Sequence, residues 1–133
     1  MASAPDVVSA WMRACSGGDT DVILALVDPD FEMTEASSLP GAVAVSGVAG
    51  LERYLRGWTR NWSQTDWRAE EITDLGGGRV LVVATLALRG LRSSIDVERR
   101  FAYLFTVRNG RILRQDGYDD RAQALAASEE GSP

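Results

Sequence analysis

The chain has 133 residues, 45% hydrophobic and 25% charged, with a net charge of −5, which suits one domain with a single core. The acidic balance argues against a nucleic-acid partner, whose phosphates require a basic surface. No apolar run approaches the roughly 18 residues of a membrane span, and the N-terminus lacks the basic and apolar regions of a signal peptide, so we expect a cytoplasmic protein without membrane contact.

The composition also restricts the possible chemistry. All 14 basic residues are arginine, and the chain contains no lysine and no histidine. This excludes Schiff-base lysines, catalytic triads and dyads that use histidine, and histidine-ligated metals. The single cysteine, Cys15, falls on the apolar side of a predicted helix and is predicted to be a small core residue. No phosphate-binding loop, metal-ligand cluster or heme motif is present, so we expect no cofactor.

The first half of the chain is predicted to be mainly helical. A helix is predicted over residues 3–15, a shorter one over 20–27 that ends at Asp28-Pro29, and then a short strand over 31–35. A third helix, over 48–62, has its apolar residues at spacings of three and four. These residues form one stripe: Leu51, Tyr54, Leu55, Trp58 and Trp62.

The second half is predicted to be mainly strands. They are expected over residues 67–75, 79–89, 95–107 and 111–118. Val80 to Leu88 is apolar at nearly every position, which indicates burial on both faces. One face would meet the core, and a homodimer through the sheet is the simplest cover for the other. A helix over 119–127 would complete a single domain of residues 1–127, followed by a flexible tail at 128–133.

Asn109-Gly110, between two alternating runs, is a strong local hairpin signal, because a type I′ turn needs positive φ at both central residues. A two-residue loop pairs Arg108 with Arg111, and the register follows by counting outward. The further pairs are Val107 with Ile112, Phe105 with Arg114, Tyr103 with Asp116, and Phe101 with Tyr118. Arg99 would lie on the same side of the sheet. An apolar face that also carries these polar residues is typical of a pocket wall.

The order of the predicted elements indicates an α+β domain. Within that order, Gly18-Asp19, Asp28-Pro29-Asp30-Phe31 and the run of residues 109–119 resemble a SnoaL-like domain of the nuclear transport factor 2-like superfamily. That superfamily includes ketosteroid isomerases and limonene epoxide hydrolases. The resemblance covers essentially the whole chain. It implies a curved antiparallel sheet wrapped on three helices of the N-terminal half, cone-shaped with an internal pocket, and dimerisation through the outer face of the sheet.

The resemblance to ketosteroid isomerases also implies site residues. The isomerase base falls at or near Glu35, its helix-one tyrosine falls on Trp11, and its second oxyanion donor falls near Tyr103. An indole N–H and a phenol can both donate hydrogen bonds. The Arg-x-Asp pair of epoxide hydrolases falls around Ala84 and Leu86, both apolar, which argues against that family's mechanism.

We predict Asp116, Glu35 and Tyr103 as the catalytic residues. An aspartate on an apolar face would have a raised pKa and could act as a general base. The alternative is that Asp116 forms a structural ion pair with Arg99 or Arg114. For Glu35 the alternative is an exposed turn residue.

Further residues are predicted to bind the substrate, although the aromatic ones among them would also suit a core, and Arg99 would suit an ion pair. They are Trp11, Tyr54, Trp58, Arg99, Phe101 and Tyr118.

Two classes of function stay open. The first is a cofactor-free isomerase or cyclase for a hydrophobic, carbonyl-bearing small molecule, with Asp116 or Glu35 as base and with Tyr103 and Trp11 stabilising the developing oxyanion. The second is a non-catalytic protein: either a binder of an apolar small molecule, or a dimeric interaction module whose pocket is filled by its own side chains.

Overall fold

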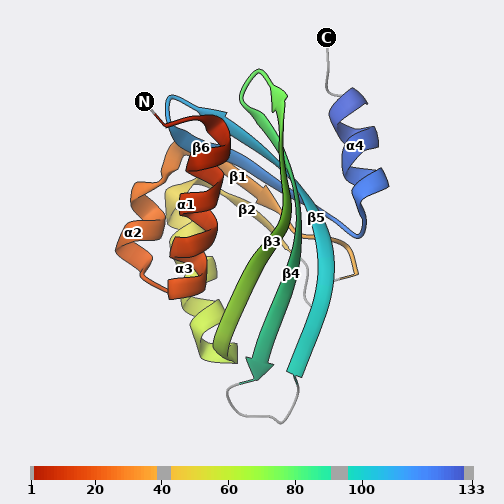
Figure 1. The fold of residues 1–133 in the computed structure, drawn as a ribbon. Helices are drawn as coiled ribbons and strands as arrows, with labels where there is room; N and C mark the ends of the chain where they lie inside the picture. The colour runs from red at the N-terminus through yellow and green to blue at the C-terminus, as the bar shows by residue number, and fades with distance from the viewer. Residues whose placement is uncertain (1, 39–42, 91–95, 131–133) are drawn as a thin grey trace.

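The computed structural model describes residues 2–38, 43–90 and 96–130 (Figure 1). In chain order the elements are α1 (Ala4–Gly17), α2 (Thr20–Ala25), β1 (Val27–Thr34), β2 (Ala44–Ser46), α3 (Gly47–Asn61), β3 (Trp62–Gly76), β4 (Arg79–Gly90), β5 (Asp96–Arg108), β6 (Arg111–Tyr118) and α4 (Arg121–Glu130). The helices α1 to α3 lie on one side of the curved sheet and α4 lies on the other (Figure 1). No helix in these ranges is long and apolar enough to cross a membrane.

The strands form one six-stranded sheet in the order β2-β1-β6-β5-β4-β3. The pairing is antiparallel throughout except between β1 and β6, which run parallel. The predicted α+β fold, a curved sheet wrapped on helices of the N-terminal half, is confirmed.

Helix α1 occurs where the sequence predicts it, although it ends at Gly17 rather than at residue 15. The Ser3 hydroxyl accepts a hydrogen bond from the Asp6 N–H, and the Asp6 carboxylate accepts one from the Ser3 N–H. This capping box satisfies N–H groups that the first turn leaves without partners. At the other end Gly18 takes a φ of 71°, which glycine adopts without steric cost. The apolar stripe of α1, which includes Trp11, is thereby held against the sheet.

Helix α2 and strand β3 have bounds that differ from the prediction. Helix α2 ends at Ala25 rather than at residue 27, because the chain joins the sheet at once: the Ile112 N–H donates to the Leu26 carbonyl at 2.8 Å. Strand β3 begins at Trp62, opposite Gly90, and not at residue 67. The assignment of Trp62 to the apolar stripe of α3 is therefore wrong.

Strand β1 runs through Asp28-Pro29, where the sequence predicts a break between a helix and a strand. Val27 pairs with Ile112 and Glu32 pairs with Arg114, so the residues between them bulge out of the ladder. A bulge tolerates proline, which has no N–H to give to the sheet.

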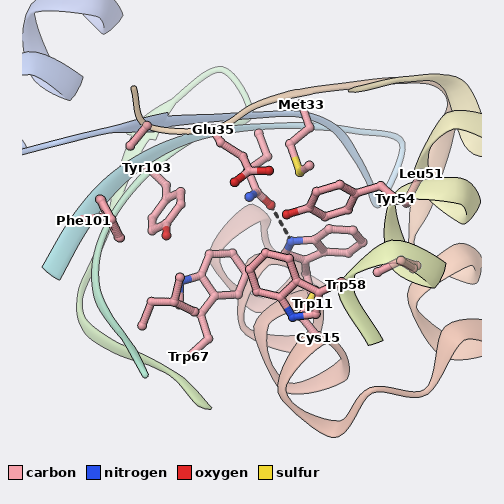
Figure 2. Close-up of a pocket in the computed structure, with 14 residues that line it drawn as sticks. Trp11, Cys15, Met33, Glu35, Leu51, Tyr54, Trp58, Trp67, Phe101 and Tyr103 are labelled. Atoms are coloured by element: carbon pink, nitrogen blue, oxygen red, sulfur yellow. Dashed lines mark hydrogen bonds between the residues drawn. The ribbon is translucent and has the colours of Figure 1, made fainter. Parts of the chain in front are cut away.

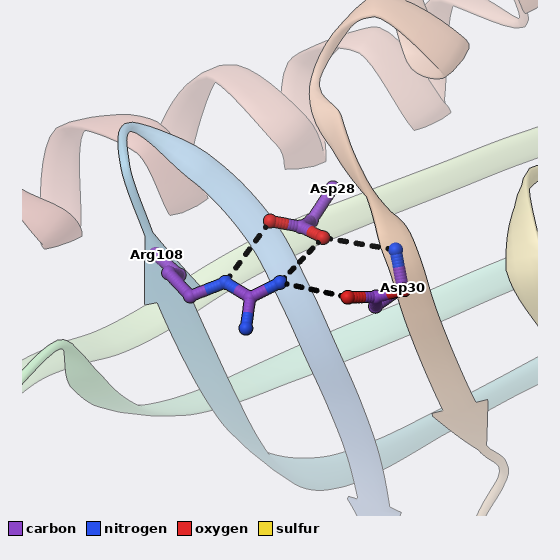
Figure 3. A network of polar contacts seen from close by, with 3 residues as sticks. All are labelled: Asp28, Asp30 and Arg108. Atoms are coloured by element: carbon purple, nitrogen blue, oxygen red, sulfur yellow. Dashed lines mark hydrogen bonds and ion pairs between the residues drawn. The ribbon is translucent and has the colours of Figure 1, made fainter.

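Arg108 holds this bulge in place (Figure 3). Its Nε and Nη2 lie 3.2 and 2.8 Å from the Asp28 carboxylate oxygens, and Nη2 lies 3.1 Å from Asp30. The Asp30 N–H also donates to Asp28 at 2.9 Å. The hydrogen bonds from Arg108, followed by that from the Asp30 N–H, lower the pKa of the Asp28 carboxyl. The ion pair thus ties the start of β1 to the end of β5.

We expect Asp28 to contribute to acid sensitivity. Because its pKa in the folded protein lies below the ordinary value of 3.8, ionised Asp28 stabilises the fold above that pH. This stabilisation is lost as the pH falls through the lowered pKa. Urea unfolding of the wild type should show a free energy that falls more steeply below about pH 4 than that of Asp28→Asn. Asp30→Asn, at an exposed position of the same cluster, is the matched control; a wild-type slope equal to that of Asp28→Asn would contradict the assignment.

Strand β4 is buried on both faces from Val80 to Ala84, as predicted, whereas Thr85 and Ala87 of the same predicted stretch are only partly buried. Its Val80, Val82 and Ala84 belong to the main core beneath the helices. On the other face, Leu81 and Val83 pack with Ala102 and Ala124, and Tyr118 and Leu125 lie against them. Helix α4 therefore covers this part of the outer face, for which a second copy of the chain is the predicted cover.

Another part of the same face carries charged side chains. There the Glu70 carboxylate lies 2.9 Å from Arg100 Nη2 and accepts a hydrogen bond from Thr85 Oγ1 at 2.6 Å. Homodimerisation through the sheet stays a prediction.

Helix α4 extends beyond its predicted end at residue 127. It continues to Glu130, Ser128 is buried, and the Ser128 carbonyl accepts from Arg79 Nη1 at 2.8 Å. Residues 128–130 thus belong to the helix and not to a flexible tail, while 131–133 lie outside the described residues.

The β5–β6 hairpin has the predicted turn and a different register beyond it. Asn109 and Gly110 have φ of 55° and 74°, and Val107 pairs with Ile112 as expected. The next pair is Thr106 with Arg114, so Leu113 is an extra residue that forms a β-bulge. Because side chains alternate along a strand, the shift reverses the face of every later β6 residue. Those residues are Arg114, Gln115, Asp116 and Tyr118.

Candidate functional site

A cavity of about 100 Å³ lies between α1, α3 and the sheet (Figure 2). Its wall is mainly aromatic and aliphatic, with few polar groups. The lining residues are Trp11 and Cys15 from α1; Met33, Glu35 and Ala36 at the end of β1; Leu51, Tyr54, Leu55 and Trp58 from α3; and Trp67, Leu86, Phe101, Tyr103 and Gln115 from the sheet. Tyr54, Leu55 and Trp58 remain partly exposed, so the α3 side is where the cavity approaches solvent.

The structure brings together most of the predicted site residues. The spacings of three and four along α3 place Tyr54 and Trp58 on one face, and alternation along β5 places Phe101 and Tyr103 on the inner face. The predicted site residues that line the cavity are Trp11, Glu35, Tyr54, Trp58, Phe101 and Tyr103.

Asp116, the first of the predicted catalytic residues, does not line the cavity. It pairs with Leu104 on the opposite face of the sheet. Its carboxylate accepts from Thr34 Oγ1 and from Arg114 Nε, both at 2.8 Å, and Arg114 also donates to Glu32 at 2.6 Å. The predicted place of Asp116 on the cavity wall is therefore wrong, and the alternative, an ion pair with Arg114, describes its contacts. The error comes from the bulge at Leu113.

Two predicted substrate-binding residues also lie outside the cavity. The same bulge turns Tyr118 to the outer face, where it packs on the cluster beneath α4. Arg99 is exposed; its Nη1 donates to the Ser38 carbonyl at 3.0 Å, and its guanidinium lies 5.5 Å from the Phe101 ring centroid. Arg99 thus packs on a lining residue without entering the cavity.

Glu35 is the carboxylate that the cavity contains. It directly follows β1 and is half-buried. Burial raises the pKa of its carboxyl, while the Tyr54 hydroxyl, which points toward it in Figure 2, lowers that pKa in part. Burial also raises the pKa values of the Tyr54 and Tyr103 hydroxyls, so both stay protonated near neutral pH. A proton acceptor and hydroxyl donors therefore share one cavity.

Gln115 takes the cavity-facing position that the sequence assigns to Asp116. Trp11 Nε1 donates to Gln115 Oε1 at 2.8 Å. An indole N–H can only donate, so the amide oxygen must face Trp11. The N–H that was predicted to stabilise an oxyanion is consequently already engaged. Only knowledge of the bulge could have identified Gln115 from the sequence.

We expect Gln115→Leu to lower the free energy of unfolding by about 1–3 kcal/mol, because it leaves the buried Trp11 N–H without an acceptor. Gln115→Glu retains an acceptor oxygen and is the matched control for hydrogen bonding. Urea unfolding near neutral pH measures both variants. A Gln115→Leu protein as stable as the wild type would show that the 2.8 Å contact contributes little.

Trp67 is a lining residue that the sequence does not mark, because there it is only the first residue of a predicted strand. It is 9% exposed, and its ring lies edge-on to that of Tyr103 with centroids 4.9 Å apart. Its backbone N–H donates to Ser16 Oγ at 3.2 Å, which joins β3 to α1. Its indole Nε1 is buried and has no hydrogen-bond acceptor of ordinary geometry.

The remaining reactive groups do not extend the site. Burial raises the pKa of the Cys15 thiol to about 12, so it is protonated at neutral pH and a poor nucleophile. Within residues 2–38, 43–90 and 96–130, histidine, cysteine and acidic side chains form no group of three or more that could hold a metal ion.

Comparison with known proteins agrees with this architecture. The family model described as "SnoaL-like domain" matches residues 8–115. No curated protein matches the sequence significantly. Among solved structures, that of TerC co-crystallised with polyporic acid is 22% identical to this chain, covers 96% of this chain and 97% of TerC, and has a TM-score of 0.75.

Two further structures show the same fold. A protein of Catenulispora acidiphila with a ketosteroid isomerase-like fold, in complex with trimethylamine, is 16% identical over 98% of this chain and 100% of its own, with a TM-score of 0.76. A Sinorhizobium meliloti protein, suggested to be a polyketide cyclase, is 26% identical over 84% of this chain and 93% of its own, with a TM-score of 0.67. The predicted resemblance is thereby confirmed at the level of the superfamily.

Proposed function

Because the chain belongs to the SnoaL-like domain family, and because its cavity holds a carboxyl among aromatic side chains, we propose that it is a cofactor-free enzyme that moves a proton on a small, hydrophobic, carbonyl-bearing molecule. The observation that carries this proposal is the position of Glu35. It lies in the cavity wall, and burial raises its pKa, which makes its carboxylate a stronger base than an exposed glutamate.

The proposed reaction begins with removal of a proton from the carbon next to the carbonyl. The Glu35 carboxylate accepts that proton, the C–H electron pair becomes the carbon–carbon double bond of an enolate, and the carbonyl oxygen gains the negative charge. A hydroxyl such as that of Tyr103 would stabilise this charge. Return of the proton to a different carbon isomerises the substrate, and return to the same carbon exchanges its hydrogen with solvent.

Exchange of hydrogen for deuterium tests this reaction directly. Cyclohexanone, a ketone of one ring, is incubated in D2O with the protein, and loss of the α-proton signal is followed by NMR. We expect exchange above the buffer rate that saturates with ketone concentration. Binding of cyclohexanone without faster exchange would contradict the catalytic proposal and support the alternative below; absence of binding would contradict a carbonyl ligand.

A non-catalytic binder of a small molecule is the second candidate. It is favoured by one observation, the approach of the Tyr54 hydroxyl to Glu35, which lowers the pKa of that carboxyl and so weakens it as a base. The neighbours co-crystallised with polyporic acid and trimethylamine support a small organic ligand under either candidate.

Homodimerisation through the sheet and a cytoplasmic location also remain proposals. Sedimentation at micromolar concentration should show a dimer, and a monomer would remove that proposal.

A further inference from the structure

The indole N–H of Trp67 is the one buried side-chain polar group, in the described part of the chain, that has no hydrogen-bond partner of ordinary geometry. Buried polar groups in folded proteins are nearly always hydrogen-bonded, so an exception calls for an explanation. The ring belongs to the cavity wall and is 9% exposed. The nearest acceptor is the Tyr103 hydroxyl: Trp67 acts as a donor toward it and so lowers the Tyr103 pKa in part, but the contact lies outside ordinary hydrogen-bond geometry. A better-placed oxygen on a ligand can therefore replace this weak contact.

Tyr103 brings a second donor to the same place. The Trp67 indole nitrogen lies on the side of its ring that faces the Tyr103 hydroxyl (Figure 2), and the two ring centroids are 4.9 Å apart. The two side chains come from β3 and β5, which flank β4 in the sheet. Trp11, by contrast, already donates its N–H to Gln115. Of these two indoles, that of Trp67 is the one that can serve a ligand.

We propose that the Trp67 indole N–H and the Tyr103 hydroxyl together bind the oxygen of a neutral carbonyl compound of about one ring. This rests on the proposed function only in taking the cavity as the site of the ligand. Two donors on one oxygen would hold the carbonyl in a defined orientation and would strengthen as that oxygen gains negative charge.

The charge of the cavity argues for a neutral ligand. Among the lining residues whose side chains the structure describes, Glu35 is the one carboxylate and none is an arginine. In an apolar enclosure an anionic ligand would be repelled by Glu35 with little screening. A cation would be attracted to the aromatic faces and to Glu35, but it has no lone pair to offer, and the Trp67 donor would stay unpaired. A neutral oxygen acceptor satisfies the donors without an added charge.

The volume of the cavity limits the size of that ligand. Its roughly 100 Å³ is below the roughly 150 Å³ of an engineered cavity that holds benzene, so one ring is the upper limit, and such a ring would extend toward the partly exposed Tyr54, Leu55 and Trp58. We therefore use a matched pair of one-ring probes: cyclohexanone, and methylenecyclohexane, which has the same shape but a CH2 group in place of the oxygen.

Indole N–H resonances of the ¹⁵N-labelled full-length protein provide the readout, with each tryptophan assigned by its Trp→Phe variant. Cyclohexanone should move the Trp67 Nε1–H signal downfield, as expected for a new hydrogen bond, and methylenecyclohexane should not. The Trp11 signal is the internal reference because its N–H is already bonded. Equal shifts of the Trp67 signal with both probes would overturn the inference. So would tighter binding of trimethylammonium than of cyclohexanone.

Affinities of the variants give a second test. Trp67→Phe should reduce the preference for cyclohexanone over methylenecyclohexane by about fivefold to tenfold, the value of one hydrogen bond, and the ratio cancels general changes in the cavity. Tyr103→Phe should act in the same direction, and it tests the site if Trp67→Phe does not fold. An unchanged ratio in a folded variant would remove that residue from the site.

The two proposals can fail separately. Saturable proton exchange without a Trp67 shift would retain the proposed enzyme and overturn the carbonyl contact. A ketone-specific Trp67 shift without exchange would retain the contact and overturn the enzyme.

Discussion

Glu35→Gln is expected to reduce α-proton exchange on cyclohexanone by about 100-fold or more, the usual contribution of a positioned general base. Glutamine has nearly the same shape, keeps an oxygen toward Tyr54, and cannot accept the proton. The substitution should not impair folding. Because burial raises the pKa of Glu35, the charged form destabilises the folded state once the pH exceeds that pKa, and a neutral side chain removes this cost. The rate is measured by NMR at a ketone concentration that saturates the wild type.

The pH dependence and two further variants separate loss of the base from general damage. The wild-type rate should rise with pH and reach half its maximum above 4.5, the ordinary value for glutamic acid, since only the ionised carboxylate can accept a proton. Glu35→Asp keeps the carboxylate but places it one methylene group farther from the substrate, and it should retain part of the rate. Asp116→Asn, on the outer face, should exchange at the wild-type rate. Wild-type turnover by Glu35→Gln would remove Glu35 from the mechanism.

Gly78→Ala is expected to lower the free energy of unfolding by about 3 kcal/mol, which is the largest effect on stability that we predict. Gly78 has a φ of +82°, and a Cβ there would lie 2.4 Å from the Val107 carbonyl oxygen. The turn cannot simply move away, because the Val107 N–H donates to the Gly78 carbonyl at 2.7 Å. Both a strained backbone and a backbone clash would therefore result. Urea unfolding near neutral pH measures the loss.

Gly77→Ala is the matched control in the same turn. Gly77 has a φ of +63°, and a Cβ there meets no atom within 4 Å. Only the left-handed backbone is then unfavourable, at about 1 kcal/mol. Similar losses for the two variants would show that the contact with Val107 is not what requires glycine at position 78.

Local signals in the sequence predicted the elements that depend on a few adjacent residues. The turn at Asn109-Gly110 is decided by one dipeptide, and it occurs in the structure. The spacing of Tyr54 and Trp58 likewise placed them on one helix face that lines the cavity.

Features that depend on distant partners were not predicted. Strand β1 continues across Pro29 because it pairs with β6 and because Arg108 forms an ion pair with Asp28. The outer cover of β4 is a helix from the end of the chain. At Leu113 no glycine or proline marks the bulge, so alternation alone gave the wrong face for Asp116. Trp67 stands out because its buried indole N–H has no hydrogen-bond acceptor of ordinary geometry. A sequence does not show which buried groups are left in that state.

The bulge at Leu113 also means that the number of residues in β6, independently of their type, determines which of its side chains reach the cavity. Removing that one residue would rotate the rest of β6 by half a turn and exchange the Gln115 amide for neighbouring charged groups. Loss of a single codon would then alter the acid–base character of the cavity while the helices and the hairpin turn keep their sequences. Such length changes offer this architecture an evolutionary route to new chemistry that a comparison of substitutions alone would overlook.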